Sequence, residues 1–171
     1  MTIRTGIQYF LILVLMAGVV FALLQPHKAQ EEQAVLGEAA PSFRISTMQG
    51  KTLELQDYKG QAVMINFWAS WCTACVNELP LLNEAYKLAG VSMLAVNVGE
   101  EADKVQTFVD RYELSFPIGL DTDMRIKQKY NVVGLPLTII IDKEGKLIER
   151  HEGELIDMAD IMSYMVQMKD D

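Results

Sequence analysis

The chain has 171 residues, half of them hydrophobic, with a formal net charge of −8 and two cysteines. This length suits a short N-terminal segment followed by one domain that can bury a core without metals or several disulfides. The acidic balance argues against a nucleic-acid partner, because phosphate binding requires clustered Lys and Arg, and two cysteines are too few for a disulfide scaffold.

The N-terminal segment is strongly apolar. Residues 7–24 are interrupted only by Gln8 and Tyr9, near their start, and a helix that crosses a bilayer core needs about 20 such residues. No small-residue cleavage site follows, so we expect a single transmembrane helix that serves as a signal-anchor. A buried helix of the domain is the alternative, which the lack of a polar face disfavours.

The flanking residues define the expected domain organisation. Residues 1–6 form a short cytoplasmic tail, residues 25–36 a polar tether, and residues 37–171 the globular domain. The charges on the two sides of the apolar segment give only a weak positive-inside signal. The very short N-terminal tail still favours placing the domain on the extracytoplasmic side of the cell membrane.

From residue 37 onward, strand patterns alternate with helix patterns. Apolar and polar residues alternate in 43–45 and 52–55 around Gln49-Gly50, which predicts a β-hairpin, and the apolar run 63–68 predicts a central strand covered on both faces. Such an order of elements predicts an α/β domain. The further expected elements are strands over 91–98 and 137–141, a short extended piece over 116–118, a last strand near 147–149, and helices from Cys72 to Gly90, over 103–112, over 124–130 and around 161–168.

The two cysteines, Cys72 and Cys75, stand where the strand 63–68 gives way to a helix. A Cys-x-x-Cys pair at such a junction is typical of a redox dithiol. The helix N-terminus lowers the pKa of the first thiol, because backbone N–H groups and the helix dipole stabilise a thiolate. Buried core cysteines and half of a zinc site are the alternatives. Zinc needs further ligands at suitable spacing, which His27 and His151 do not supply, so we expect no metal.

Two segments, 67–75 and 133–138, resemble the two halves of a thioredoxin-fold active site. With three further segments they resemble the TlpA/ResA-like membrane-anchored thiol-disulfide oxidoreductases of bacteria, which carry an AhpC/TSA-type redoxin domain. The resemblance implies a thioredoxin-like fold with a central mixed β-sheet flanked by helices and an N-terminal β-hairpin. The three further segments are 40–43, 97–100 and 120–123.

The resemblance also implies roles for single residues. Cys72 is the exposed nucleophile and Cys75 the resolving thiol, so the redox-active disulfide Cys72–Cys75 is the redox group and no cofactor is expected. Pro136 is implied to be cis and to expose the backbone of Leu135 to a substrate strand; an ordinary strand-initiating proline is the alternative. Glu78 is implied to handle protons. It shares a helix face with Cys75, and desolvation would raise its pKa, although a solvated helix glutamate is the alternative.

Residues between and beside the cysteines are expected to face the substrate: Trp71, Thr73 and Ala74, together with Leu135. Many relatives carry a proline directly before the second cysteine, whereas this chain has Ala74 there. The intervening pair influences the thiol pKa and the reduction potential, so the potential and the preferred substrate are the properties that this departure affects.

The function implied is the reduction of disulfides in exported proteins, above all the Cys-x-x-Cys-His of apocytochrome c during cytochrome c maturation. A CcdA-like membrane electron donor would restore the dithiol. Another envelope or spore-cortex protein is an alternative substrate. A peroxiredoxin-like peroxidase would require threonine where Ala69 stands. A Sco-like copper-binding protein would space its cysteines by three residues and carry a histidine near them.

Overall fold

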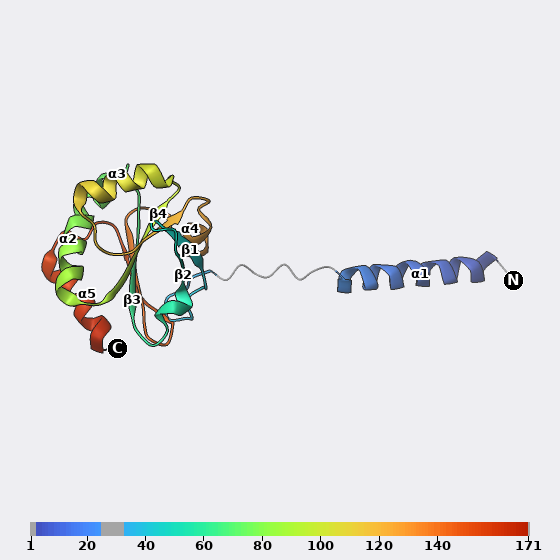
Figure 1. Cartoon of the computed structure of the whole chain (residues 1–171). Helices are drawn as coiled ribbons and strands as arrows, with labels where there is room; N and C mark the ends of the chain where they lie inside the picture. The colour runs from blue at the N-terminus through green and yellow to red at the C-terminus, as the bar shows by residue number, and fades with distance from the viewer. Residues whose placement is uncertain (1–2, 25–32, 171) are drawn as a thin grey trace. The chain divides into compact units, whose positions relative to one another are not determined.

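The computed structural model describes residues 3–24 and 33–170, and the chain divides into two units, residues 1–31 and 32–171 (Figure 1). The first unit contains the helix α1 (Ile3–Leu24).

The apolar segment 7–24 lies within α1, so the expectation of a helix is confirmed. The expectation that it crosses a membrane is not supported, because no helix among the described residues is both long and apolar enough to do so. The expected tether, residues 25–36, lies largely outside the described residues.

The second unit alternates strands and helices as its sequence pattern predicts. In chain order the elements are β1 (Arg44–Thr47), β2 (Thr52–Glu54), the 3-10 helix η1 (Leu55–Tyr58), β3 (Val63–Trp68), α2 (Thr73–Ala89), β4 (Ser92–Val98), α3 (Ala102–Tyr112), β5 (Ile118–Asp121), α4 (Arg125–Lys129), β6 (Leu137–Ile141), β7 (Leu147–Glu152) and α5 (Met158–Asp170).

The strands of this unit form one mixed sheet in the order β2-β1-β5-β4-β3-β6-β7. The pairs β3–β4 and β4–β5 are parallel, and the remaining pairs are antiparallel. The predicted hairpin is confirmed, with Arg44 opposite Glu54 and Gly50 in the turn at a φ of 72°. Every residue of β3 is buried, as its unbroken apolar run predicts for a strand covered on both faces.

Helices cover both faces of the sheet (Figure 1). Residues of α2, α3 and α5 pack with even-numbered residues of β3, such as Met64 and Trp68, in one core cluster. On the opposite face, Ile126 of α4 and Tyr130 pack against Phe67 and its neighbours. Because β3 and β4 are parallel neighbours, the loops that follow them emerge at the same edge of the sheet. The cysteines lie in the first of these loops and at the start of α2.

Candidate active site

The loop after β3 leads into α2 through a tight turn. The backbone N–H of Cys72 donates to the carbonyl oxygen of Ala69 at 3.2 Å, which closes a turn over residues 69–72. Cys72 is also the N-cap of α2, and its sulfur accepts a hydrogen bond from the Cys75 N–H at 3.2 Å. The helix therefore directs a backbone donor at the sulfur of Cys72, which is the arrangement that stabilises a thiolate.

Cys72 and Cys75 form a disulfide, with their Cα atoms 5.3 Å apart. The two residues differ in accessibility, since Cys72 is 8% exposed and Cys75 is 0% exposed. Exchange requires a sulfur of another molecule to approach one of these sulfurs. Within the bonded pair, Cys72 offers that approach and Cys75 is closed off by the core.

The residues expected to face the substrate differ in how exposed they are. Trp71 is 65% exposed, Thr73 is also exposed, and Ala74 is half-buried. Leu135 is half-buried and packs against the core cluster that contains both cysteines. The Leu135–Pro136 peptide bond is cis, and the carbonyl oxygen of Pro136 accepts a hydrogen bond from the N–H of Gly153 at 3.0 Å.

Glu78 is fully buried, so the alternative of a solvated helix glutamate is wrong. One carboxyl oxygen accepts a hydrogen bond from the Asn66 amide at 2.6 Å, and the other accepts one from the Leu155 N–H at 2.6 Å. Burial raises the pKa of Glu78 to about 7, while the hydrogen bonds from Leu155 and Asn66 act in the opposite direction. The carboxyl can therefore exchange a proton near neutral pH.

Three residues of this hydrogen-bond network are absent from the sequence-based site. Asn66 and Leu155 bond to the carboxyl itself, and the hydroxyl oxygen of Thr138 accepts a second bond from the Asn66 amide at 2.9 Å. Two of these residues could have been found from the sequence, because each is a polar residue within an apolar run. Asn66 is the polar residue within the apolar strand run 63–68, and Thr138 interrupts the run 137–141. A polar side chain buried in a strand needs a hydrogen-bond partner. Leu155 contributes only its backbone, so its side chain carries no such signal.

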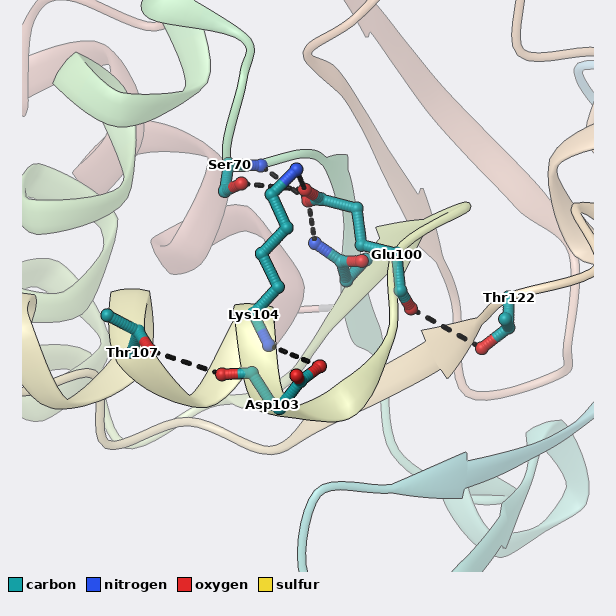
Figure 2. Close-up of polar contacts among 7 residues, drawn as sticks. Ser70, Glu100, Asp103, Lys104, Thr107 and Thr122 are labelled. Carbon is teal, nitrogen blue, oxygen red and sulfur yellow. Dashed lines mark hydrogen bonds and ion pairs between the residues drawn. The ribbon is translucent and has the colours of Figure 1, made fainter.

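A second buried carboxylate, Glu100, lies after β4 beside the turn that precedes the cysteines (Figure 2). It accepts hydrogen bonds from the N–H and hydroxyl of Ser70 at 2.7 and 2.6 Å, and from the Asn97 amide at 2.9 Å. The Lys104 ammonium pairs with it at 2.7 Å. Burial acts to raise the pKa of Glu100, but the bonds from Lys104, Ser70 and Asn97 outweigh it and lower the pKa to about 2.

Of the two histidines, His151 alone lies among the described residues. His151 lies on β7 with its ring 6.1 Å from that of Tyr164, and His27 lies outside the described residues. Within residues 3–24 and 33–170, no group of three or more His, Cys, Asp or Glu is arranged to hold a metal ion. The expectation that the protein carries no metal or other cofactor stays a prediction.

Comparison with known proteins places this site in a family. The model of the AhpC/TSA family matches residues 36–150. The thiol-disulfide oxidoreductase ResA of Bacillus cereus is 39% identical over 154 residues, which cover 88% of this chain and 89% of the relative. ResA of Bacillus subtilis is 37% identical over 170 residues, 98% of this chain and 92% of the relative.

A solved structure agrees with these relatives in fold. The exposed lipoprotein thioredoxin of Streptococcus pneumoniae superimposes with a TM-score of 0.65 at 34% identity, covering 74% of this chain and 98% of that protein. The mixed sheet with flanking helices is thus the expected thioredoxin-like fold. Given this fold, the two ResA relatives and the bonded cysteines in the Cys-x-x-Cys position, the chain belongs to the AhpC/TSA family and, within it, to the thiol-disulfide oxidoreductases of the ResA type.

Proposed function

We propose that this protein reduces disulfides in exported proteins, with Cys72 as the nucleophile and Cys75 as the resolving thiol. The observation that carries the exchange chemistry and the assignment of the two thiols is their difference in accessibility, 8% for Cys72 against 0% for Cys75. The attacking thiol must meet a substrate sulfur, whereas the resolving thiol needs to reach only its neighbour. The Cys75 N–H directed at the sulfur of Cys72 favours the thiolate at the same position.

The exchange proceeds in two displacement steps. The Cys72 thiolate attacks one sulfur of the substrate disulfide, forming a mixed disulfide and releasing the other substrate sulfur as a thiolate. The Cys75 thiolate then attacks the sulfur of Cys72, which forms the Cys72–Cys75 disulfide and releases the second substrate thiolate. Two electrons pass from the protein dithiol to the substrate, and two protons follow onto the substrate thiolates. A further turnover requires a dithiol donor that reduces Cys72–Cys75 again.

Glu78 is suited to the proton transfer that the second step requires. Cys75 must lose its proton before it attacks, and because it is fully buried the acceptor must be a group of the protein itself. Glu78 lies one helical turn further along α2, and burial raises the pKa of its carboxyl to about 7. A group with a pKa near the working pH accepts and returns a proton most effectively. We therefore assign Glu78 the role of proton acceptor for Cys75.

The substrate chain is proposed to lie across the exposed residues beside Cys72. The backbone of Leu135, which precedes the cis proline Pro136, offers an edge with which an extended substrate segment can pair. Trp71, Thr73 and Ala74 would contact the substrate on the other side of the sulfur. Since these contacts combine backbone pairing with few charges, the site suits peptide segments around a disulfide rather than one small disulfide compound.

The proposed substrate is the Cys-x-x-Cys-His disulfide of apocytochrome c, and a CcdA-like membrane protein is the proposed electron donor. Another disulfide protein of the cell envelope or spore cortex is the second candidate. A location outside the cytoplasm fits both substrates and is supported by the pneumococcal relative, which is described as an exposed lipoprotein. A membrane-impermeant alkylating reagent applied to intact cells should label reduced Cys72. Labelling only after lysis would place the domain in the cytoplasm and contradict the proposed location.

Trapping of reaction intermediates tests the assignment of the two cysteines. A Cys75→Ser variant should accumulate mixed disulfides through Cys72, both with insulin and with an oxidised Cys-x-x-Cys-His peptide. A Cys72→Ser variant should accumulate none, because its remaining thiol is buried. Mass spectrometry of the adducts identifies the bonded cysteine. Adducts confined to Cys75 would overturn the assignment, and a wild-type protein unable to reduce either substrate would overturn the proposed function.

A further inference from the structure

We propose that Glu100 is a positioning residue of the redox site, because its carboxylate fixes the turn over residues 69–72 that presents Cys72 to the substrate. The inference rests on the proposed function and adds to it a residue that contacts neither sulfur. Its evidence is the arrangement of donors around this carboxylate (Figure 2).

Glu100 contacts the turn at Ser70, one of its two central residues. The Cys72 N–H closes the turn onto the Ala69 carbonyl, which places Ser70 and Trp71 at its two central positions. Both polar groups of Ser70 donate to Glu100, the N–H to one carboxyl oxygen at 2.7 Å and the hydroxyl to the other at 2.6 Å. Two bonds to the two oxygens of one carboxylate fix direction as well as distance. The exposed Trp71 and the sulfur of Cys72 follow immediately in the chain.

Glu100 is itself held from two other elements. The Asn97 amide, at the end of β4, donates to it at 2.9 Å, and Lys104, in the first turn of α3, pairs with it at 2.7 Å. The Thr122 hydroxyl also donates to the Glu100 carbonyl oxygen at 3.4 Å. The side chain is buried while that of Lys104 is 57% exposed, so the ion pair runs from the interior to the surface. The turn over residues 69–72 is thereby attached through Glu100 to the end of β4 and to the start of α3.

The consequence for the chemistry concerns the thiolate of Cys72. Its stabilisation depends on the alignment between the sulfur and the N–H of Cys75, 3.2 Å away in the disulfide form. Donors that are already in place cost no reorganisation when charge develops. If the turn loosens, this alignment is lost for part of the time, so the pKa of the Cys72 thiol rises. Removing the negative charge of Glu100 without loosening the turn would instead lower that pKa.

The experiment compares wild type with Glu100→Gln, Ser70→Ala and the control Asp121→Asn. Asp121 is also a buried carboxylate, but it accepts bonds from the N–H groups of Ile126 and Lys127 at the start of α4. The rate of Cys72 alkylation by iodoacetamide against pH gives the thiol pKa of each reduced protein. Insulin reduction gives the exchange rate, and guanidinium unfolding gives the fraction folded.

We expect Glu100→Gln to raise the pKa of Cys72 and to slow exchange on the order of tenfold per folded molecule. Ser70→Ala, which removes one of the two bonds, should have a smaller effect of the same sign and decides the question if Glu100→Gln does not fold. Asp121→Asn should lose stability with an unchanged thiol pKa. A thiol pKa that falls, or that matches the control, overturns the inference. A wild-type protein that reduces no disulfide refutes the proposed function instead, and the thiol titration still tests Glu100.

Discussion

At the scale of single residues, the burial of Glu78 makes the stability of the protein depend on pH. Its pKa is raised from an ordinary 4.5 to about 7 by burial, so the folded state holds this proton more tightly than the unfolded chain. The stabilisation is therefore complete below about pH 4.5 and is lost as the pH rises through about 7. With about 1.4 kcal/mol for each pKa unit, the loss amounts to about 3 kcal/mol.

Glu78→Gln should remove this dependence, because glutamine has the same shape and no proton to lose. The free energy of unfolding of the oxidised protein, in which the cysteines do not titrate, is measured in guanidinium at pH 5 and pH 8. The difference between wild type and variant should change by about 2.5 kcal/mol over this interval, because part of the loss has already occurred at pH 5, and the variant should gain relative stability at pH 8. Parallel pH profiles would mean that Glu78 is ionised in the folded protein at both pH values.

Single residues also mark the limit of prediction from the sequence. The cysteine pair could be identified because its spacing and its position at a strand–helix junction are local features. The buried state of Glu78 could not, because its partner Asn66 lies 12 positions away and Leu155 lies 77 away in the chain. Glu100 belonged to a segment that the family resemblance includes, yet its bond to Ser70 spans 30 positions. Contacts of that separation depend on the register of the sheet.

At the scale of elements, the central strands and the long helices could be predicted closely, because their apolar periodicity is local. The extended piece expected over 116–118 is instead the strand β5 over Ile118–Asp121. The run 63–68 became β3 without change, and the helix after Cys72 ends where Gly90 adopts a φ of 63°. The close approach of neighbouring elements was not visible in the same pattern. Gly119 of β5 lies opposite Thr47 of β1, and nothing in its sequence context shows that a side chain there has no room.

Gly119→Ala should therefore destabilise the protein. A Cβ atom at this position would lie 2.5 Å from Cδ1 and 3.0 Å from Cγ1 of Ile45, which is itself buried and cannot move into solvent. Overpacking of this kind costs about 1–3 kcal/mol. The free energy of unfolding in guanidinium measures the cost. Gly134→Ala is the matched control, since a Cβ there meets no atom within 4 Å.

The double variant Gly119→Ala/Ile45→Ala identifies the cause. Truncating Ile45 removes the atoms that the new methyl group would meet, so the double variant should lose less stability than the sum of the two single variants. Additive losses would show that the conformation of the glycine backbone, rather than contact with Ile45, determines the effect.

At the scale of the whole molecule, the direction of electron flow is linked to the stability of the two redox forms. When a dithiol reduces other proteins, folding must stabilise its disulfide relative to the unfolded chain, so the folded protein is more stable in its oxidised form. The folded form of a strong oxidant is instead more stable when its cysteines are reduced. The bond joins residues only three positions apart, so it restricts the unfolded chain little. A difference in stability between the two forms therefore reports on the folded surroundings of the cysteines.

We expect the oxidised protein to unfold at higher guanidinium concentration than the protein kept reduced by excess dithiothreitol. Each 30 mV by which the folded protein has a lower potential than its unfolded chain corresponds to about 1.4 kcal/mol of this difference. The Cys72→Ser/Cys75→Ser variant, measured under both conditions, controls for effects of dithiothreitol on the rest of the fold. A reduced form that is the more stable of the two would make the protein an oxidant. The proposed direction of exchange would then be wrong, while the roles of Cys72 and Cys75 would stand.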